Sequence, residues 1–162
     1  MREHHSSAQH QSTLWKRGGI LLGIGLGGFF DGIVLHQILQ WHHLVSETYH
    51  PTSLRNLEIN TLADGLFHAF TWVASVIGLF YVWSGTRGEH PEWSTRAFLG
   101  TLLLGWGGFN LVEGLINHQI LGIHHVRPGP YWLAYDIGFL VWGLLMVVIG
   151  YAWMKQQNRS AA

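Results

Sequence analysis

Four long runs of apolar residues alternate with shorter polar stretches along the chain. The runs cover about residues 18–40, 62–83, 97–121 and 131–153, and each reaches the length of about 20 residues that a bilayer-spanning helix needs. Backbone polar groups cannot bond to water inside a bilayer, so such runs favour helices, whose hydrogen bonds are internal. The pattern therefore predicts an all-α protein with four transmembrane helices.

The two ends of the chain are polar. Residues 1–15 contain three of the 12 histidines and no apolar run, so we expect a disordered tail there and a second short tail at 156–162. Between the tails, residues 16–155 predict a single transmembrane domain. Lys16 and Arg17 precede the first run, as in a signal peptide. However, the run is too long and lacks a small-residue cleavage site, which indicates a retained span.

Two stretches near the ends of the first and third runs repeat each other. Residues 31–43 read Asp-Gly-x3-His-Gln-Ile-Leu-x2-His-His, and residues 113–125 repeat this order with Glu in place of Asp. The repeat predicts a bundle of two tandem helical hairpins that start on the same side, related by a pseudo-two-fold axis along the membrane normal. Glycines at helical spacing predict close packing of these helices: Gly25, Gly28 and Gly32 in one copy, and Gly100, Gly107 and Gly114 in the other.

The basic residues predict the orientation of the helices. Seven of the nine Lys and Arg residues precede the first apolar run, follow the fourth or lie in the 84–96 loop, whereas the other two loops hold only Arg55 and Arg127. By the positive-inside rule both termini face the cytoplasm, and the 41–61 loop faces outward. Within that loop Thr52 or Ser53 can cap a helix. We therefore expect the second span to project outward by two or three turns.

Composition limits the classes of function. The chain is 48% apolar and only 11% charged, and Lys plus Arg equals Asp plus Glu at nine each. This balance gives no field that attracts nucleic acid, so the lipid bilayer is the expected partner. The absence of cysteine excludes disulfides, iron–sulfur clusters and thiolate metal sites.

Ionisable groups inside the apolar runs are the candidates for chemistry, because an acid costs at least about 2.5–3.5 kcal/mol at the centre of a bilayer. Four of them, one from each predicted helix, lie at a similar depth: His36, His68, His118 and Asp136. Asp64 lies one turn nearer the outer surface, in an i,i+4 relation to His68. Asp31 and Glu113, the acids of the repeat, lie about one turn deeper.

Imidazoles and carboxylates without thiolates suit zinc, copper(II), iron or manganese. The sequence therefore predicts a transition-metal site of one or two ions in the outer half of the bilayer, with a redox or metal-handling role but no assigned reaction. The expected ligands are His36, His68, His118, Asp136 and Asp64.

Asp31 and Glu113 are expected as additional ligands or as supports for ligands. At 100° per residue, Asp31 and His36 lie about 140° apart on an α-helix. Both face inward only in a wide interior or if the helix unwinds near Gly32. The outer histidine doublets are the remaining candidates, as further ligands or as an entry point: His42, His43, His124 and His125.

Other readings of the same residues stay open. His36 and His118 could ligate one haem from both sides, although a haem gives no role to Asp31, Glu113, Asp64 or His68. Asp31 and Glu113 could belong to a proton or ion path, although the inner half is dry. The protein could be a non-catalytic assembly factor. The charged groups could also only pair across the hairpins: His36 with Glu113, His118 with Asp31, and His68 with Asp136.

The doubled motif, with Ala63-Asp64-Gly65-x2-His68 between its copies, resembles a family of bacterial four-helix integral membrane proteins known as a domain of unknown function. The resemblance covers about residues 16–155. It implies a multi-pass protein of the bacterial inner membrane, but it brings no activity and no ligand. Respiratory membrane complexes, or a second copy of the chain, are the protein partners that we expect.

Overall fold

The computed structural model describes residues 2–87 and 94–160, with side chains described over 9–87 and 94–156. Helix α1 (Arg2–Phe30) continues into a π-helical segment, η1 (Asp31–Ile38), and α3 (Thr95–Glu113) continues into another, η2 (Gly114–Ile120). The other two helices are α2 (Leu54–Thr86) and α4 (Trp132–Ser160). Over these residues the structure contains four helices long and apolar enough to cross a membrane and no strand, which confirms the predicted fold class.

Several helices extend beyond the apolar runs. Helix α2 begins at Leu54, where the Ser53 hydroxyl caps it by accepting a hydrogen bond from the Asn56 backbone nitrogen at 3.2 Å. Helix α2 therefore begins about two turns before the second apolar run, at the cap that the sequence predicted. Helix α1 begins at Arg2, within the segment that we expected to be a disordered tail, and α4 continues to Ser160. Packing explains part of the extension of α1, because Trp15 is fully buried beside Gly85 of α2.

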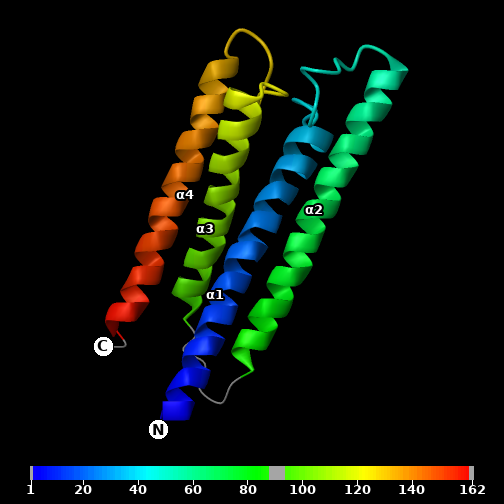
Figure 1. Ribbon diagram of the computed structural model, residues 1–162. Coiled ribbons are helices and arrows are strands. Elements are labelled where there is room, and N and C mark those ends of the chain that lie inside the picture. Colours follow the sequence, from blue (N-terminus) through cyan, green and yellow to red (C-terminus); the bar gives the residue numbers. More distant parts are fainter. Residues whose placement is uncertain (1, 88–93, 161–162) are drawn as a thin grey trace.

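The two hairpins meet through α1 and α3 (Figure 1). Each of these helices packs against its hairpin partner and against the other, whereas α2 and α4 do not contact each other over the described residues. The most apolar windows of α1 and α3 are accordingly 50% and 39% buried, against 17% for α2 and α4. Helices α2 and α4 therefore present most of their surface to lipid.

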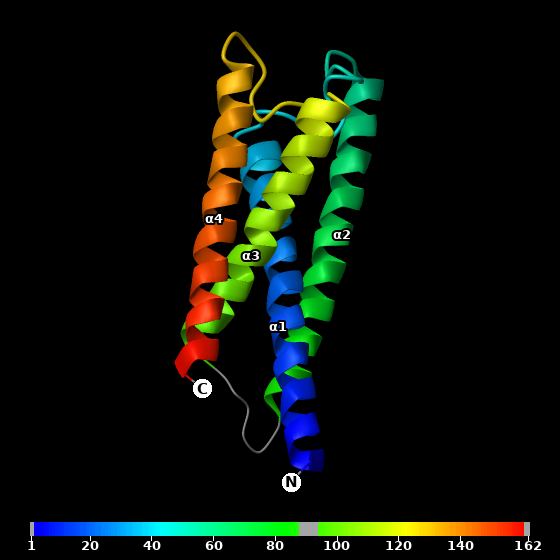
Figure 2. The same ribbon diagram turned by 60° about the vertical axis from the view of Figure 1, so that its left-hand side comes forward.

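The first and third helices run in the same direction, so the repeat is parallel as predicted (Figures 1 and 2). Both ends of the chain lie at one end of the helices. The connections at 39–53 and 121–131, which follow the repeated motifs, lie at the opposite end. We call this opposite end the loop end.

Glycine allows the helices of each hairpin to approach closely. A Cβ atom added to Gly107 of α3 would lie 2.5 Å from the carbonyl oxygen of Gly143 of α4, and one added to Gly100 would lie 2.8 Å from that of Gly150. These contacts involve backbone atoms, which cannot move aside as a flexible side chain could. The packing role predicted for Gly100 and Gly107 is confirmed.

We expect Gly107→Leu to separate α3 from α4 and to lower the free energy of unfolding by about 1–3 kcal/mol, the usual cost of overpacking. Gly138→Leu is the matched control, because a Cβ atom at Gly138 of α4 meets no atom within 4 Å. Thermal unfolding of both variants in detergent micelles measures the difference. Equal midpoints for the two leucine variants would show that the glycine contact does not determine the packing.

Candidate metal centre

The π-helical segments bring the acid of each motif onto its histidine. In a π-helix the backbone hydrogen bond spans five residues rather than four, so residues five apart come to lie above one another. The carboxylate of Asp31 lies 3.1 Å from Nε2 of His36, and that of Glu113 lies 3.1 Å from Nε2 of His118. The separation of about 140° that regular α-helix geometry gives is thereby removed. Local unwinding near Gly32, one of the two arrangements that the sequence left open, is present, and the second copy shows the same at Gly114.

After each π-helical segment the chain reverses direction through a left-handed residue. These residues occupy equivalent positions in the repeat, Gln40 with φ of 48° and Gly122 with φ of 57°. The reversal turns the next histidines back over the helix ends. His42 and His124 are consequently only 3% and 0% exposed, although both follow the ends of the spans.

Four buried imidazoles meet at the loop end of α1 and α3. The rings of His42 and His124 are stacked at the centre, with centroids 4.6 Å apart and planes 6° apart. His36 lies beside His42 at 4.4 Å, and His118 lies beside His124 at 4.8 Å. We call these four side chains the imidazole cluster: His36, His42, His118 and His124.

Each central imidazole is oriented by the loop of the other repeat. Nδ1 of His42 donates a hydrogen bond to the carbonyl oxygen of Val126 at 2.8 Å, and Nδ1 of His124 donates one to that of Leu44 at 2.8 Å. Burial, with neighbouring His124 and His36 adding to it, lowers the pKa of His42 to about 2, so its imidazole is neutral. Nε2 of His42 then carries a lone pair directed into the cluster.

Two buried aspartates orient the outer pair of imidazoles. An oxygen of Asp64 lies 2.9 Å from Nδ1 of His36, and an oxygen of Asp136 lies 3.5 Å from Nδ1 of His118. A carboxylate behind one ring nitrogen is the usual support of a histidine that binds metal through the other nitrogen. Three of the four histidines of the cluster thus have a hydrogen-bond acceptor at Nδ1. Nδ1 of His118 lies 3.5 Å from Asp136 and has no hydrogen-bond partner among the described residues.

Both aspartates also bind the loop that follows each motif. Asp64 accepts hydrogen bonds from Gln37 Nε2 at 3.0 Å, His43 Nδ1 at 2.7 Å and the Leu44 backbone nitrogen at 2.9 Å. Asp136 makes the equivalent contacts at 3.0, 2.8 and 3.0 Å, from Gln119, His125 and the Val126 backbone nitrogen. The two copies of the motif therefore form two copies of one hydrogen-bond network.

Several nitrogen and oxygen atoms in the interior of the cluster have no hydrogen-bond partner among the described residues. Nε2 of His36, His42 and His118 and Oε2 of Glu113 are buried without a hydrogen-bond partner among the described residues. Nε2 of His124 lies 2.8 Å from Oε1 of Glu113, although its Nδ1 already carries the donated hydrogen. Two acceptors at this distance require a cation between or beside them, either a proton or a metal ion.

The distances suit a metal ion. Two ligand atoms at about 2.0–2.1 Å from one tetrahedral ion lie about 3.4 Å apart, and the acid-to-imidazole contacts in the cluster range from 2.8 to 4.0 Å. Two groups of three residues offer atoms that all lie within 4.8 Å of one another. The groups are His36, His42 and His124, and Glu113, His118 and His124.

The structure brings most of the predicted site residues together, but in other places than expected. Asp31, His36, Glu113 and His118 converge, while Asp64, Asp136, His43 and His125 surround them on the Nδ1 side. His68 lies outside the cluster, since its Nδ1 donates to the carbonyl oxygen of Asp64 at 2.8 Å and its Nε2 faces Gly32. The ion pairs considered across the hairpins are not those observed, because each acid of the motif contacts histidines of its own repeat.

Sequence reasoning assigned His42 and His124 to the outer rim, whereas they occupy the centre. It gave no role to Gln37 and Gln119, which bind the two aspartates. Both omissions had a signal in the sequence, because His-Gln and His-His recur at identical positions in the two copies.

Comparison with known proteins identifies the family. The family described as "Predicted membrane protein (DUF2243)" matches residues 18–157, which is most of the chain, so the protein belongs to this family. No curated protein and no solved structure matches the chain. The family's description supports the membrane assignment and names no ligand or reaction.

We expect Asp64→Leu and Asp136→Leu each to lower the free energy of unfolding by about 3–5 kcal/mol, because several buried donors lose their acceptor. Similar losses are expected from both, since the two networks match. Denaturant unfolding in micelles measures the effect, and Glu58→Leu, at an exposed position of α2, is the control. An Asp64→Leu protein as stable as the control would contradict the structural role given to this carboxylate.

Proposed function

We propose that the protein binds transition-metal ions at the imidazole cluster. One observation carries the proposal: the Nε2 atoms of four buried imidazoles face one another and two carboxylates, and three of the four rings are held by a hydrogen-bond acceptor at Nδ1. The fourth ring, that of His118, has the carboxylate of Asp136 3.5 Å from its Nδ1. Neutral imidazoles bind metal through the nitrogen that carries no hydrogen, and an acceptor behind the ring selects which nitrogen that is. A purely structural polar core would not leave the Nε2 atoms of three buried imidazoles without a hydrogen-bond partner among the described residues.

The repeat favours two ions over one. Each copy contributes one carboxylate and two imidazoles, which are Asp31, His36 and His42 in the first and Glu113, His118 and His124 in the second. One Nε2 atom binds only one ion, so His124 cannot complete both groups of three at once. Assigning each set to its own repeat gives every ion two nitrogen ligands and one carboxylate.

Two imidazoles and one carboxylate suit several metals. This set holds iron(II) in oxygenases and zinc in peptidases, with coordination positions left open in both. Copper(II) and manganese remain compatible with nitrogen and oxygen ligands. Open positions support a redox or metal-handling role rather than a purely structural ion.

The packing gives less support to a haem. A haem held by His36 and His118 needs its porphyrin between these two rings. The stacked rings of His42 and His124 occupy this region, at 4.4 Å from His36 and 4.8 Å from His118 respectively. The two central histidines would have to leave the cluster before a porphyrin could enter.

The charge distribution supports a position near the outer face of a bacterial inner membrane. Seven of the nine Lys and Arg residues belong to the end of the molecule that carries the termini or to the adjoining 84–96 loop. The cluster lies near the loop end, because η1 and η2, which carry His36 and His118, end there. With both termini cytoplasmic by the positive-inside rule, the metal ions would lie in the outer half of the bilayer.

Protein purified without chelators is expected to carry about two equivalents of one transition metal and to show no Soret absorption. His42→Ala and His124→Ala each remove one of the two imidazole ligands of one ion. Each variant is therefore expected to lose at least one equivalent of metal. Elemental analysis by mass spectrometry, together with an absorption spectrum, measures both quantities.

His68→Ala is the matched control, because His68 is a histidine of the same membrane layer that lies outside the cluster. It is expected to keep the full metal content. Absence of metal from the wild-type protein after growth and reconstitution with iron, zinc, copper and manganese would contradict the proposal. The network would then consist of protonated imidazoles paired with carboxylates.

A further inference from the structure

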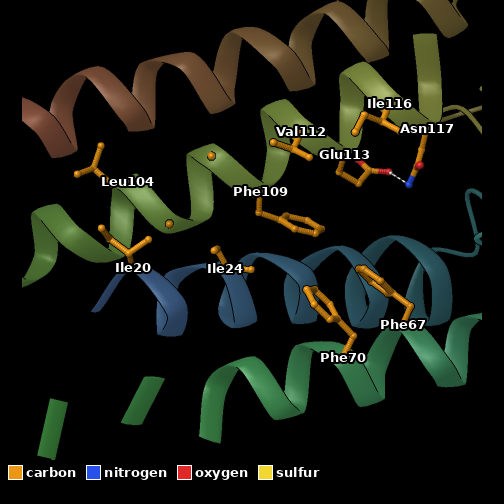
Figure 3. Close-up of a pocket in the computed structure, with 12 residues that line it drawn as sticks. Ile20, Ile24, Phe67, Phe70, Leu104, Phe109, Val112, Glu113, Ile116 and Asn117 are labelled. Carbon is orange, nitrogen blue, oxygen red and sulfur yellow. Dashed lines mark hydrogen bonds between the residues drawn. The ribbon is translucent and has the colours of Figure 1, made fainter. Parts of the chain in front are cut away.

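Two pockets adjoin the candidate metal centre, and their linings differ. One lies along α3 and reaches the buried residue Glu113 (Figure 3). Apart from Glu113 and Asn117, every residue that lines it is apolar, and Phe70 and Val112 are 56% and 59% exposed on the lipid side. A metal ion on this path would have to leave water for an apolar surface, which is costly for a charge. This pocket is therefore a poor route for an ion.

The second pocket lies at the loop end, and we call it the loop-end pocket. Its volume is about 530 Å³, and it is lined mainly by residues 40–52 of the connection between η1 and α2. Its lining includes His42, which also belongs to the imidazole cluster. No Lys or Arg lines it, and His50 and Thr52 of its lining are exposed. The loop-end pocket therefore lies directly outside the cluster and is open to water.

Three side chains of the loop-end pocket carry metal-binding groups in addition to His42. They are His43, Glu47 and His50. Two imidazoles and one carboxylate are the same set of donors that each repeat contributes to the cluster, and such donors bind divalent transition metals. The three side chains do not form a closed group, because the only groups of three with all ligand atoms within 4.8 Å among the described residues belong to the cluster. An open set of donors suits capture and release of an ion rather than storage.

The imidazole of His43 is already oriented as a ligand. Its Nδ1 donates a hydrogen bond to Oδ2 of Asp64 at 2.7 Å, and its side chain is 16% exposed. In a neutral imidazole this arrangement leaves the lone pair on Nε2. The other oxygen of Asp64 lies 2.9 Å from Nδ1 of His36. One carboxylate thus supports an imidazole of the cluster and an imidazole of the loop-end pocket.

The backbone fixes the positions of Glu47 and His50, whereas their side chains remain available. The backbone nitrogen of Glu47 donates to the carbonyl oxygen of Ile123 at 3.0 Å, and the carbonyl oxygen of His50 accepts from Asn56 Nδ2 at 2.9 Å. Neither side chain makes a hydrogen bond to another described residue. The fold therefore holds this part of the loop without using the two metal-binding groups.

The second repeat has no equivalent of these donors. Its connection, residues 121–131, contains no acid and no histidine beyond the His124-His125 doublet. It carries Arg127 instead, whose guanidinium lies 5.2 Å from the centroid of the Trp41 ring and donates to the Tyr135 hydroxyl at 2.8 Å. The cluster is built from both repeats although only one loop supplies the additional donors. The architecture of the cluster therefore does not account for Glu47 and His50.

We propose that the loop-end pocket captures divalent transition-metal ions from water and passes them to the imidazole cluster, with His43, Glu47 and His50 as its ligands. The proposal rests on the proposed function, because it assigns a path to the ions that the cluster binds. Ions then enter from the side of the membrane that the loop end faces.

Rapid mixing of metal-free protein in detergent with cobalt(II), followed by its visible absorption on binding, tests the proposal. The double variant Glu47→Gln/His50→Ala leaves the cluster and its supporting carboxylates intact. It is expected to lower the second-order rate constant of cobalt uptake by about tenfold, since local charge and donors raise the rate of encounter. Its final cobalt content is expected to equal that of the wild type.

Glu58→Gln/His10→Ala is the matched control, because it removes the same two residue types from exposed positions that do not line the loop-end pocket. It is expected to change neither the rate nor the final content. A wild-type rate in Glu47→Gln/His50→Ala, or an equal decrease in the control, would overturn the proposal. A lower final content in Glu47→Gln/His50→Ala would overturn it as well, because the pocket would then hold a resident ion.

The same measurements separate the two claims. Full cobalt uptake at equal rates by the wild type and both double variants contradicts only the capture site. A wild-type protein that takes up no cobalt contradicts the proposed function and, with it, the capture site.

Discussion

The site depends on two buried carboxylates of the peripheral helices, Asp64 on α2 and Asp136 on α4. Each faces a histidine of the preceding central helix and accepts hydrogen bonds from the loop that follows that helix. Buried carboxylates are costly unless they are fully bonded, so the helix end, the loop and the hairpin partner must adopt one mutual arrangement. The orientation of the imidazoles follows from this requirement.

The exchange of contacts between the repeats completes the centre. His42 binds the carbonyl oxygen of Val126, and His124 binds that of Leu44, so each loop orients a histidine from the other half. Neither hairpin could form the cluster alone. The symmetry is nevertheless incomplete, because the second repeat carries Gly108 and Asn117 where the first carries Leu26 and Leu35.

The sequence predicted the four spans, the parallel repeat and the helix cap at Ser53, because apolar length, internal repetition and capping chemistry are local properties. It also identified the acids and histidines of the motif as one group. It misplaced His42 and His124, because regular α-helical counting carries the chain outward past Leu39, whereas the chain reverses at Gln40 and Gly122. It also overvalued His68, whose spacing from Asp64 allowed a shared ligand but whose Nδ1 bonds to the Asp64 backbone instead.

X-ray absorption at the metal edge of the purified protein tests the central claim most directly. The account predicts a first shell of nitrogen and oxygen at about 2.0–2.1 Å, with the outer-shell scattering of two imidazoles for each ion and no sulfur. A metal edge without imidazole scattering would contradict the account, because ions held elsewhere would leave the buried, unpartnered Nε2 atoms of His36, His42 and His118 unexplained. Absence of any transition-metal edge in reconstituted protein would contradict it as well.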